Sequence, residues 1–134
     1  MAFPRRLLTA STWRHLGLGT TVIITALGSL ALLSPLTAAD TLGVMPATPE
    51  GRDITAKSMV FLGARDLAIA GILFWLHSDG KGREMGVVLT SFLLVCGADT
   101  YVAAQGPRGW DAGISGLCAG AGVIAFVGIG LLQG

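Results

Sequence analysis

Four long apolar stretches dominate the pattern of hydrophobic and polar positions along the chain. Each reaches the length of about 20 residues that an α-helix needs to cross the hydrocarbon core of a bilayer. We therefore expect an all-α fold: a single membrane domain over residues 1–134 that forms an integral membrane four-helix bundle. The predicted spans are residues 16–36, 54–76, 85–105 and 112–133.

The polar connections between the predicted spans differ in length. Residues 77–84 and 106–111 are short, glycine-containing hairpins, whereas residues 37–53 form one long outer loop with Pro46 and Pro49. Long ordered loops often act as lids or binding loops. A flexible connector is the alternative interpretation of this segment.

The first span has some features of a secretory signal. Arg5, Arg6 and Arg14 precede it, and Thr37-Ala38-Ala39 follows as a small-residue motif of the kind that signal peptidases cleave. Its apolar stretch is longer than the usual 7–15 residues of a signal core. We therefore favour a retained first helix.

The distribution of basic residues predicts the orientation of the spans. Basic residues are enriched in cytoplasmic loops of membrane proteins. A cytosolic N-terminus places one set of basic residues inside and a smaller set outside, and both termini then lie in the cytosol. The inner set is Arg5, Arg6, Arg14, Lys81 and Arg83, and the outer set is Arg52, Lys57 and Arg108.

Composition supports a lipid environment and argues against nucleic acid as a partner. Of 134 residues, 52% are hydrophobic and 13% are charged, about half the charged fraction of a soluble domain. The chain has 20 glycines, which suit close helix packing in membranes. Its formal charge is only +1, and it has no basic stripe with interleaved aromatic residues.

Three charged residues lie well inside the predicted spans. Arg65 and Asp66 are near the middle of the second span, and Asp99 is in the third. An ionised side chain at mid-membrane costs about 2.5–3.5 kcal/mol even on the lenient insertion scale. Three such groups on so short a chain are expected to face one another rather than lipid. Lys57, near the outer end of the second span, would help to balance the two aspartates.

Hairpin geometry predicts which of these groups meet. If the second and third spans fold back around residues 80–81, Arg65 is level with Val95, and Asp99 lies about 6 Å nearer the outer side. Helical side chains tilt toward the helix N-terminus, which for Arg65 is also the outer side. We therefore expect Arg65 to reach Asp99. The same construction for the last hairpin puts Ser115 near the depth of Asp99.

The fourth span carries Ala112, Gly116 and Gly120 at intervals of four, the small-xxx-small pattern of close helix approach. This pattern favours packing within the bundle, with a homo-oligomer interface as the alternative. Cys96 and Cys118 are expected to be unpaired packing residues.

Metal and triad chemistries find little support in the sequence. No spacing of histidine, cysteine and carboxylate predicts a metal site, and we expect no cofactor. His15 and His77 lie near the inner ends of their spans, away from Asp99.

An arginine between two aspartates suits acid–base chemistry in a partly apolar cavity. One carboxylate can stay ionised as a general base while the other keeps a proton as a general acid. Such a set can open an epoxide: one carboxylate activates water or a substrate hydroxyl, and the other protonates the leaving oxygen. The alternative is a structural ion-pair cluster in a non-enzymatic membrane scaffold or a transport-related protein.

The motif residues also resemble those of a family of small four-span membrane proteins of largely unknown function. The resemblance rests on Gly43-Val-Met-Pro46, Gly63-Ala-Arg65-Asp66-Leu67 with Gly71, and the late Asp99, and it covers the chain from about residue 16 onward. Gly-x-Arg-Asp inside a span is its most specific element. Some fungal members are assigned as epoxide hydrolases in polyene-pyrone polyketide clusters of the aurovertin, citreoviridin and asteltoxin type.

This resemblance implies a membrane epoxide hydrolase or cyclase of secondary metabolism in the endoplasmic reticulum. Arg65, Asp66 and Asp99 would form its site, with Asp99 as base, Asp66 as acid and Arg65 as the bridge. Its partners would be the bilayer and an apolar small-molecule substrate. The expected polar neighbours on the substrate side are Lys57, Tyr101 and Ser115.

Overall fold

Five α-helices make up the part of the chain that the structure, a computed structural model, describes: residues 8–42, 46–105 and 112–133. No strand occurs among these residues, which confirms the predicted all-α fold. The helices are α1 (Ala10–Leu33), α2 (Pro35–Leu42), α3 (Pro49–Ser78), α4 (Gly82–Ala104) and α5 (Ala112–Leu132).

Four of these helices are long and apolar enough to cross a membrane, as predicted. The candidate spans are Ala10–Leu33, Pro49–Ser78, Gly82–Val102 and Ser115–Leu132. The chain thus has the make-up of an integral membrane protein with four spanning helices.

The helix ends are set by capping residues. The Thr9 hydroxyl accepts a hydrogen bond from the backbone N–H of Thr12 at the start of α1, and Thr48 does the same for Gly51 at the start of α3. These bonds satisfy donors that have no partner within the helix. Between α3 and α4, Gly80 has a φ of +73°, a conformation that glycine adopts without strain.

The segment expected as one long loop, residues 37–53, differs in the structure. It contains most of α2 and the first turn of α3, which begins at Pro49. Proline at the first helical position has no N–H to leave unpaired, so Pro35 and Pro49 start helices here instead of interrupting them. Residues 43–45 of this segment and the hairpin expected at 106–111 lie outside the described residues.

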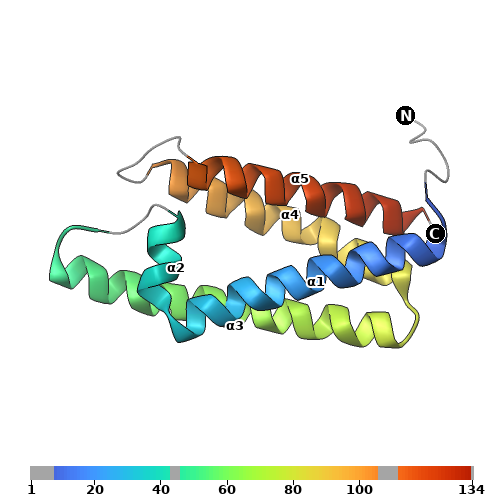
Figure 1. Cartoon of the computed structure of the whole chain (residues 1–134), viewed down its shortest axis with the longest axis horizontal. Helices are drawn as coiled ribbons and strands as arrows, with labels where there is room; N and C mark the ends of the chain where they lie inside the picture. Colours follow the sequence, from blue (N-terminus) through green and yellow to red (C-terminus); the bar gives the residue numbers. More distant parts are fainter. Residues whose placement is uncertain (1–7, 43–45, 106–111, 134) are drawn as a thin grey trace.

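The helices form two antiparallel pairs that diverge toward one end (Figure 1). Helix α1 packs along α3, and α4 packs along α5. The pairs converge where α1 begins, α5 ends and α3 turns into α4. At the other end α2 stands between the pairs, and Ala38 and Ala39 bury against Ala31 and Met59.

The convergent end holds a tightly packed core, here called the packed region: Trp13, Leu73, Met85, Leu89 and Leu131. Leu73, Met85 and Leu89 are fully buried. The Trp13 ring lies directly on Gly130, where a Cβ atom would overlap it. Helix α5 approaches α1 this closely only because residue 130 has no side chain.

Candidate functional site

Arg65 forms ion pairs with both Asp66 and Asp99, as the sequence predicts. Its Nη2 lies 3.0 Å from Asp66 Oδ1 and 3.0 Å from Asp99 Oδ2. Two further hydrogen bonds reinforce the pairs, from Nε to Asp66 at 3.2 Å and from Nη1 to Asp99 at 3.5 Å. The guanidinium thus bridges both carboxylates, and it joins α3 to α4.

The two carboxylates differ in accessibility. The side chain of Asp66 is 11% exposed, whereas that of Asp99 is 28% exposed. Asp66 faces the interior from the middle of α3, opposite Gly28 of α1, where a Cβ atom would lie 3.2 Å from Asp66 Cβ. Of the two, Asp99 is the more exposed carboxylate.

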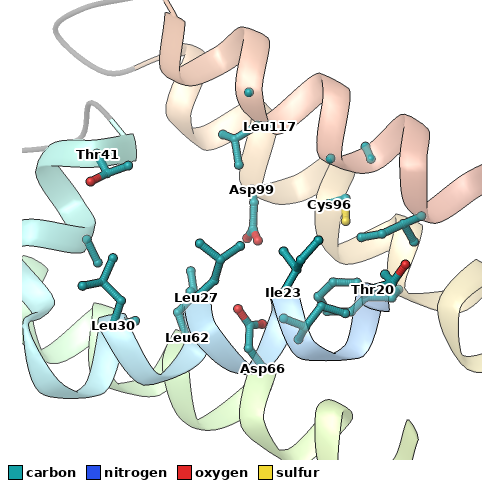
Figure 2. A pocket seen from close by; sticks show the side chains of 18 of the residues that line it. Thr20, Ile23, Leu27, Leu30, Thr41, Leu62, Asp66, Cys96, Asp99 and Leu117 are labelled. Atoms are coloured by element: carbon teal, nitrogen blue, oxygen red, sulfur yellow. The ribbon is translucent and has the colours of Figure 1, made fainter. Parts of the chain in front are cut away.

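Both aspartates line one cavity of about 260 Å³, here called the acidic cavity. Figure 2 shows Asp66 and Asp99 pointing toward one another from α3 and α4, with Ile23 and Leu27 of α1 beside them. The rest of the wall is almost wholly apolar and comes from all five helices. Carboxylates in the wall of an otherwise apolar cavity are an arrangement typical of a binding or catalytic site.

The other predicted site residues do not join this cluster. Lys57 pairs with Asp53, one turn earlier on α3, at 2.9 Å, and both side chains are largely exposed. Tyr101 is 67% exposed, and Ser115 is also exposed. None of the three lines the acidic cavity.

Gly116 and Gly120 of α5 have a different role from the one that the sequence favours. Gly116 and Gly120 are exposed, and a Cβ atom added at either would meet nothing within 4 Å. They therefore do not mediate close packing within the bundle; instead they line the acidic cavity. The close contacts occur elsewhere, for example at Gly63, where a Cβ atom would lie 2.7 Å from the Gly28 carbonyl oxygen.

Sequence reasoning did not find the wall that α1 and α2 supply. Thr20, Ile23, Leu27, Ala38 and Thr41 all line the cavity. Most of these residues are apolar or small. Such residues are equally common at lipid-facing positions, at core positions and in cavity walls, so the sequence pattern does not indicate a cavity. The Thr20 hydroxyl could have served as a hint, but it donates its hydrogen bond to the Leu16 carbonyl.

The described residues contain no cluster of three or more His, Cys, Asp or Glu side chains that could hold a metal ion. The two cysteines are free, Cys96 at the cavity wall and Cys118 exposed on α5. The ionisable groups that line the acidic cavity are the carboxylates of Asp66 and Asp99 and the Cys96 thiol, and Arg65 pairs with both carboxylates.

Comparison with protein families gives one match. The model of a family described as a domain of unknown function, DUF4267, matches residues 21–131. The chain belongs to this family. The DUF4267 match spans Arg65, Asp66 and Asp99, and it agrees with the expected family of four-helix proteins of unknown function. No curated protein and no solved structure matches the chain.

Proposed function

We propose that this DUF4267 protein is a membrane epoxide hydrolase or cyclase that acts on an apolar polyketide epoxide of secondary metabolism. The observation that carries the proposal is that two carboxylates, bridged by one arginine, line the same apolar cavity. Opening an epoxide needs a base for the nucleophile and an acid for the leaving oxygen, and both must reach one small ring.

In the proposed reaction, ionised Asp99 is the general base and protonated Asp66 is the general acid. Asp99 takes a proton from water while the water oxygen bonds to one epoxide carbon. The bond from that carbon to the ring oxygen breaks, and Asp66 donates its proton to this oxygen. The proton on Asp99 then returns to Asp66 through water, so the net change is addition of one water molecule. For a cyclase, a substrate hydroxyl replaces water.

The difference in exposure supports this division of roles. Burial disfavours an ionised carboxylate, and Asp66 is the more buried of the two. Asp99 is the more exposed of the two and lines the cavity, where an attacking water or hydroxyl would meet the general base. Nη2 of Arg65 lies 3.0 Å from an oxygen of each carboxylate, so it holds the two side chains close together. Its positive charge keeps the net charge of the three side chains no more negative than −1.

The experiment uses microsomes that contain the chain, long-chain and polyene-pyrone epoxides, and ¹⁸O-labelled water. The expected result is an ¹⁸O-labelled diol with the wild type, and product without label where an internal hydroxyl attacks. Asp99→Asn should abolish turnover, because the amide cannot accept the proton. Asp53→Asn is the matched control, since Asp53 is an exposed aspartate in a pair outside the cluster. Turnover by Asp99→Asn at the wild-type rate, or no turnover by any variant, would refute the proposal.

A second candidate is a structural ion-pair cluster in a scaffold or transport-related protein. The observation that favours it is that Arg65 already pairs with both carboxylates. Thermal unfolding of Asp99→Asn in detergent separates the two candidates. The enzyme proposal expects a melting temperature near that of the wild type, because the asparagine can still accept a hydrogen bond from Arg65, and Asp66 can give up its proton and neutralise Arg65. A structural cluster expects a clear loss of stability and no turnover in the wild type.

We further propose that the protein resides in the endoplasmic reticulum with both termini in the cytosol. The start of α1 and the end of α5 lie at the same end of the bundle (Figure 1), which supports placing both termini on one side of the membrane. The basic residues near the N-terminus favour the cytosolic side. Protease protection of tags on the two termini in sealed microsomes tests it. Cleavage of both tags without detergent is the expected result, and protection of either would overturn it.

A further inference from the structure

The acidic cavity opens sideways, along the seam between α1 and α5. Three of its apolar lining residues are also more than half exposed: Ile23 at 58%, Leu27 at 55% and Val123 at 51%. A side chain that lines a cavity and is itself exposed marks the rim of the opening. These three residues belong to helices that are candidate membrane spans, so this rim faces lipid.

The absence of side chains at Gly116 and Gly120 keeps this seam open. Both glycines line the cavity, and neither would bring a Cβ atom within 4 Å of another group. Farther along the same two helices the seam is closed, because the Trp13 ring of α1 lies on Gly130 of α5. The seam between α1 and α5 is therefore closed near Trp13 and Gly130 and open near Gly116 and Gly120.

The chemistry of the cavity selects one class of occupant. Its wall is apolar except for the carboxylates, which suits a hydrocarbon chain. Asp66 and Asp99 line the cavity whereas Arg65 does not, so an anionic head group such as a fatty-acid carboxylate meets the ionised Asp99 carboxylate and is repelled. A volume of about 260 Å³ is below the usual 300–1,000 Å³ of a small-molecule pocket, so a long molecule would fit only in part.

We propose that the α1–α5 seam is a lateral portal through which a neutral, elongated apolar molecule reaches the acidic cavity directly from the bilayer. Its polar end contacts Asp66 and Asp99, and its remaining chain stays among the lipids. Gly116 and Gly120 determine specificity by leaving the portal wide enough for such a chain. This proposal deepens the proposed function by naming the route and shape of its substrate.

The test measures binding and does not depend on turnover. The protein in liposomes is irradiated with a neutral C16 alcohol that carries a mid-chain diazirine, and labelled peptides are identified by mass spectrometry. The variant Gly116→Leu/Gly120→Leu fills the portal, and Gly122→Leu is the matched control. Gly122 lies on the same helix, also has nothing within 4 Å of a built Cβ atom, and does not line the cavity.

The expected result is labelling of the rim residues Ile23, Leu27 and Val123 in the wild type and in Gly122→Leu. Labelling should fall roughly tenfold in the double variant, which corresponds to about 1.4 kcal/mol of lost binding. The fatty acid with the same diazirine should label the rim more weakly than the alcohol. Equal labelling of the double variant and the Gly122→Leu control, or stronger labelling by the fatty acid, would overturn the portal.

Turnover measured on the same samples keeps this proposal separate from the proposed function. If the rim is labelled as expected but no epoxide is opened, the portal stands and the reaction is wrong. If epoxides are opened and the double variant retains both labelling and turnover of long-chain epoxides, the reaction stands and the portal is wrong. A circular-dichroism melt of each variant confirms that the leucines have not unfolded the bundle.

Discussion

In the packed region, α3 and α4 meet through fully buried side chains such as Leu73 and Leu89, whereas beside the acidic cavity they are joined by Arg65 and Asp99. In lipid, apolar side chains gain little by leaving their surroundings, so helices associate through close packing and polar contacts. In the packed region the helices associate through close packing, and beside the cavity they associate through polar contacts. A bundle can therefore hold an open space at mid-membrane if charged groups replace the missing apolar contacts.

The largest expected effect comes from removing the cation of the cavity region. Arg65→Leu leaves Asp66 and Asp99 close together without a partner for their charges. We expect a loss of about 3 kcal/mol, the lower end of the range for breaking a buried pair, because the Arg65 side chain is 35% exposed. Unfolding of the purified protein by SDS in mixed micelles measures this loss.

A rescue variant checks the cause of that loss. Arg65→Leu/Asp66→Asn/Asp99→Asn carries none of the three charges and should recover most of the stability, while remaining inactive. If the single variant Arg65→Leu is as stable as the wild type, charges do not hold the cavity region together, and the comparison between the two regions fails.

In the packed region, the corresponding change removes packing atoms. Leu73→Ala leaves a void among fully buried neighbours, and we expect a loss of about 2 kcal/mol. Leu27→Ala is the control at the cavity rim, where the side chain is 55% exposed and the change should cost under about 0.5 kcal/mol. The same SDS titration compares the two variants, and equal losses would contradict the distinction between the regions.

A smaller effect is expected where α1 and α3 approach most closely. A Cβ atom at Gly63 would lie 2.7 Å from the Gly28 carbonyl oxygen, and backbone cannot move aside without separating the helices. We expect Gly63→Ala to cost about 1–2 kcal/mol. Gly71→Ala, on the same helix with nothing within 4 Å, should instead be neutral or stabilising by up to about 1 kcal/mol. In one detergent, the melting temperature of Gly63→Ala should fall below that of the wild type, and the melting temperature of Gly71→Ala should stay the same or rise.

The smallest effect belongs to the exposed ion pair at the start of α3. Lys57 and Asp53 are one helical turn apart, and their side chains are 72% and 65% exposed. Such pairs contribute about 0.3–0.5 kcal/mol, so Lys57→Gln should lower the melting temperature by no more than about 1–2 °C. A loss as large as that of Arg65→Leu would show that Lys57 acts with the buried cluster after all.

The sequence by itself determined the four spanning helices and the meeting of Arg65 with Asp99. Both follow from local rules: hydrocarbon thickness sets the length of an apolar span, and a tight hairpin sets which residues of two helices share a depth. Because a charge in lipid carries a high energetic cost, Arg65, Asp66 and Asp99 are then expected to pair with one another. These predictions needed no knowledge of how the two helix pairs pack.

The short helix α2 was missed because its eight residues are too few and too polar for an apolar pattern to stand out. The separate roles of two kinds of glycine, those at close contacts and those at the cavity, were decided only by the tertiary structure. In sequence, Gly63 and Gly116 look alike, since both lie in apolar spans. Whether a missing side chain lets two helices touch or leaves a space between them depends on the distance between those helices. That distance is set by contacts far away in the chain, such as Trp13 against Gly130, which periodicity along one helix does not encode.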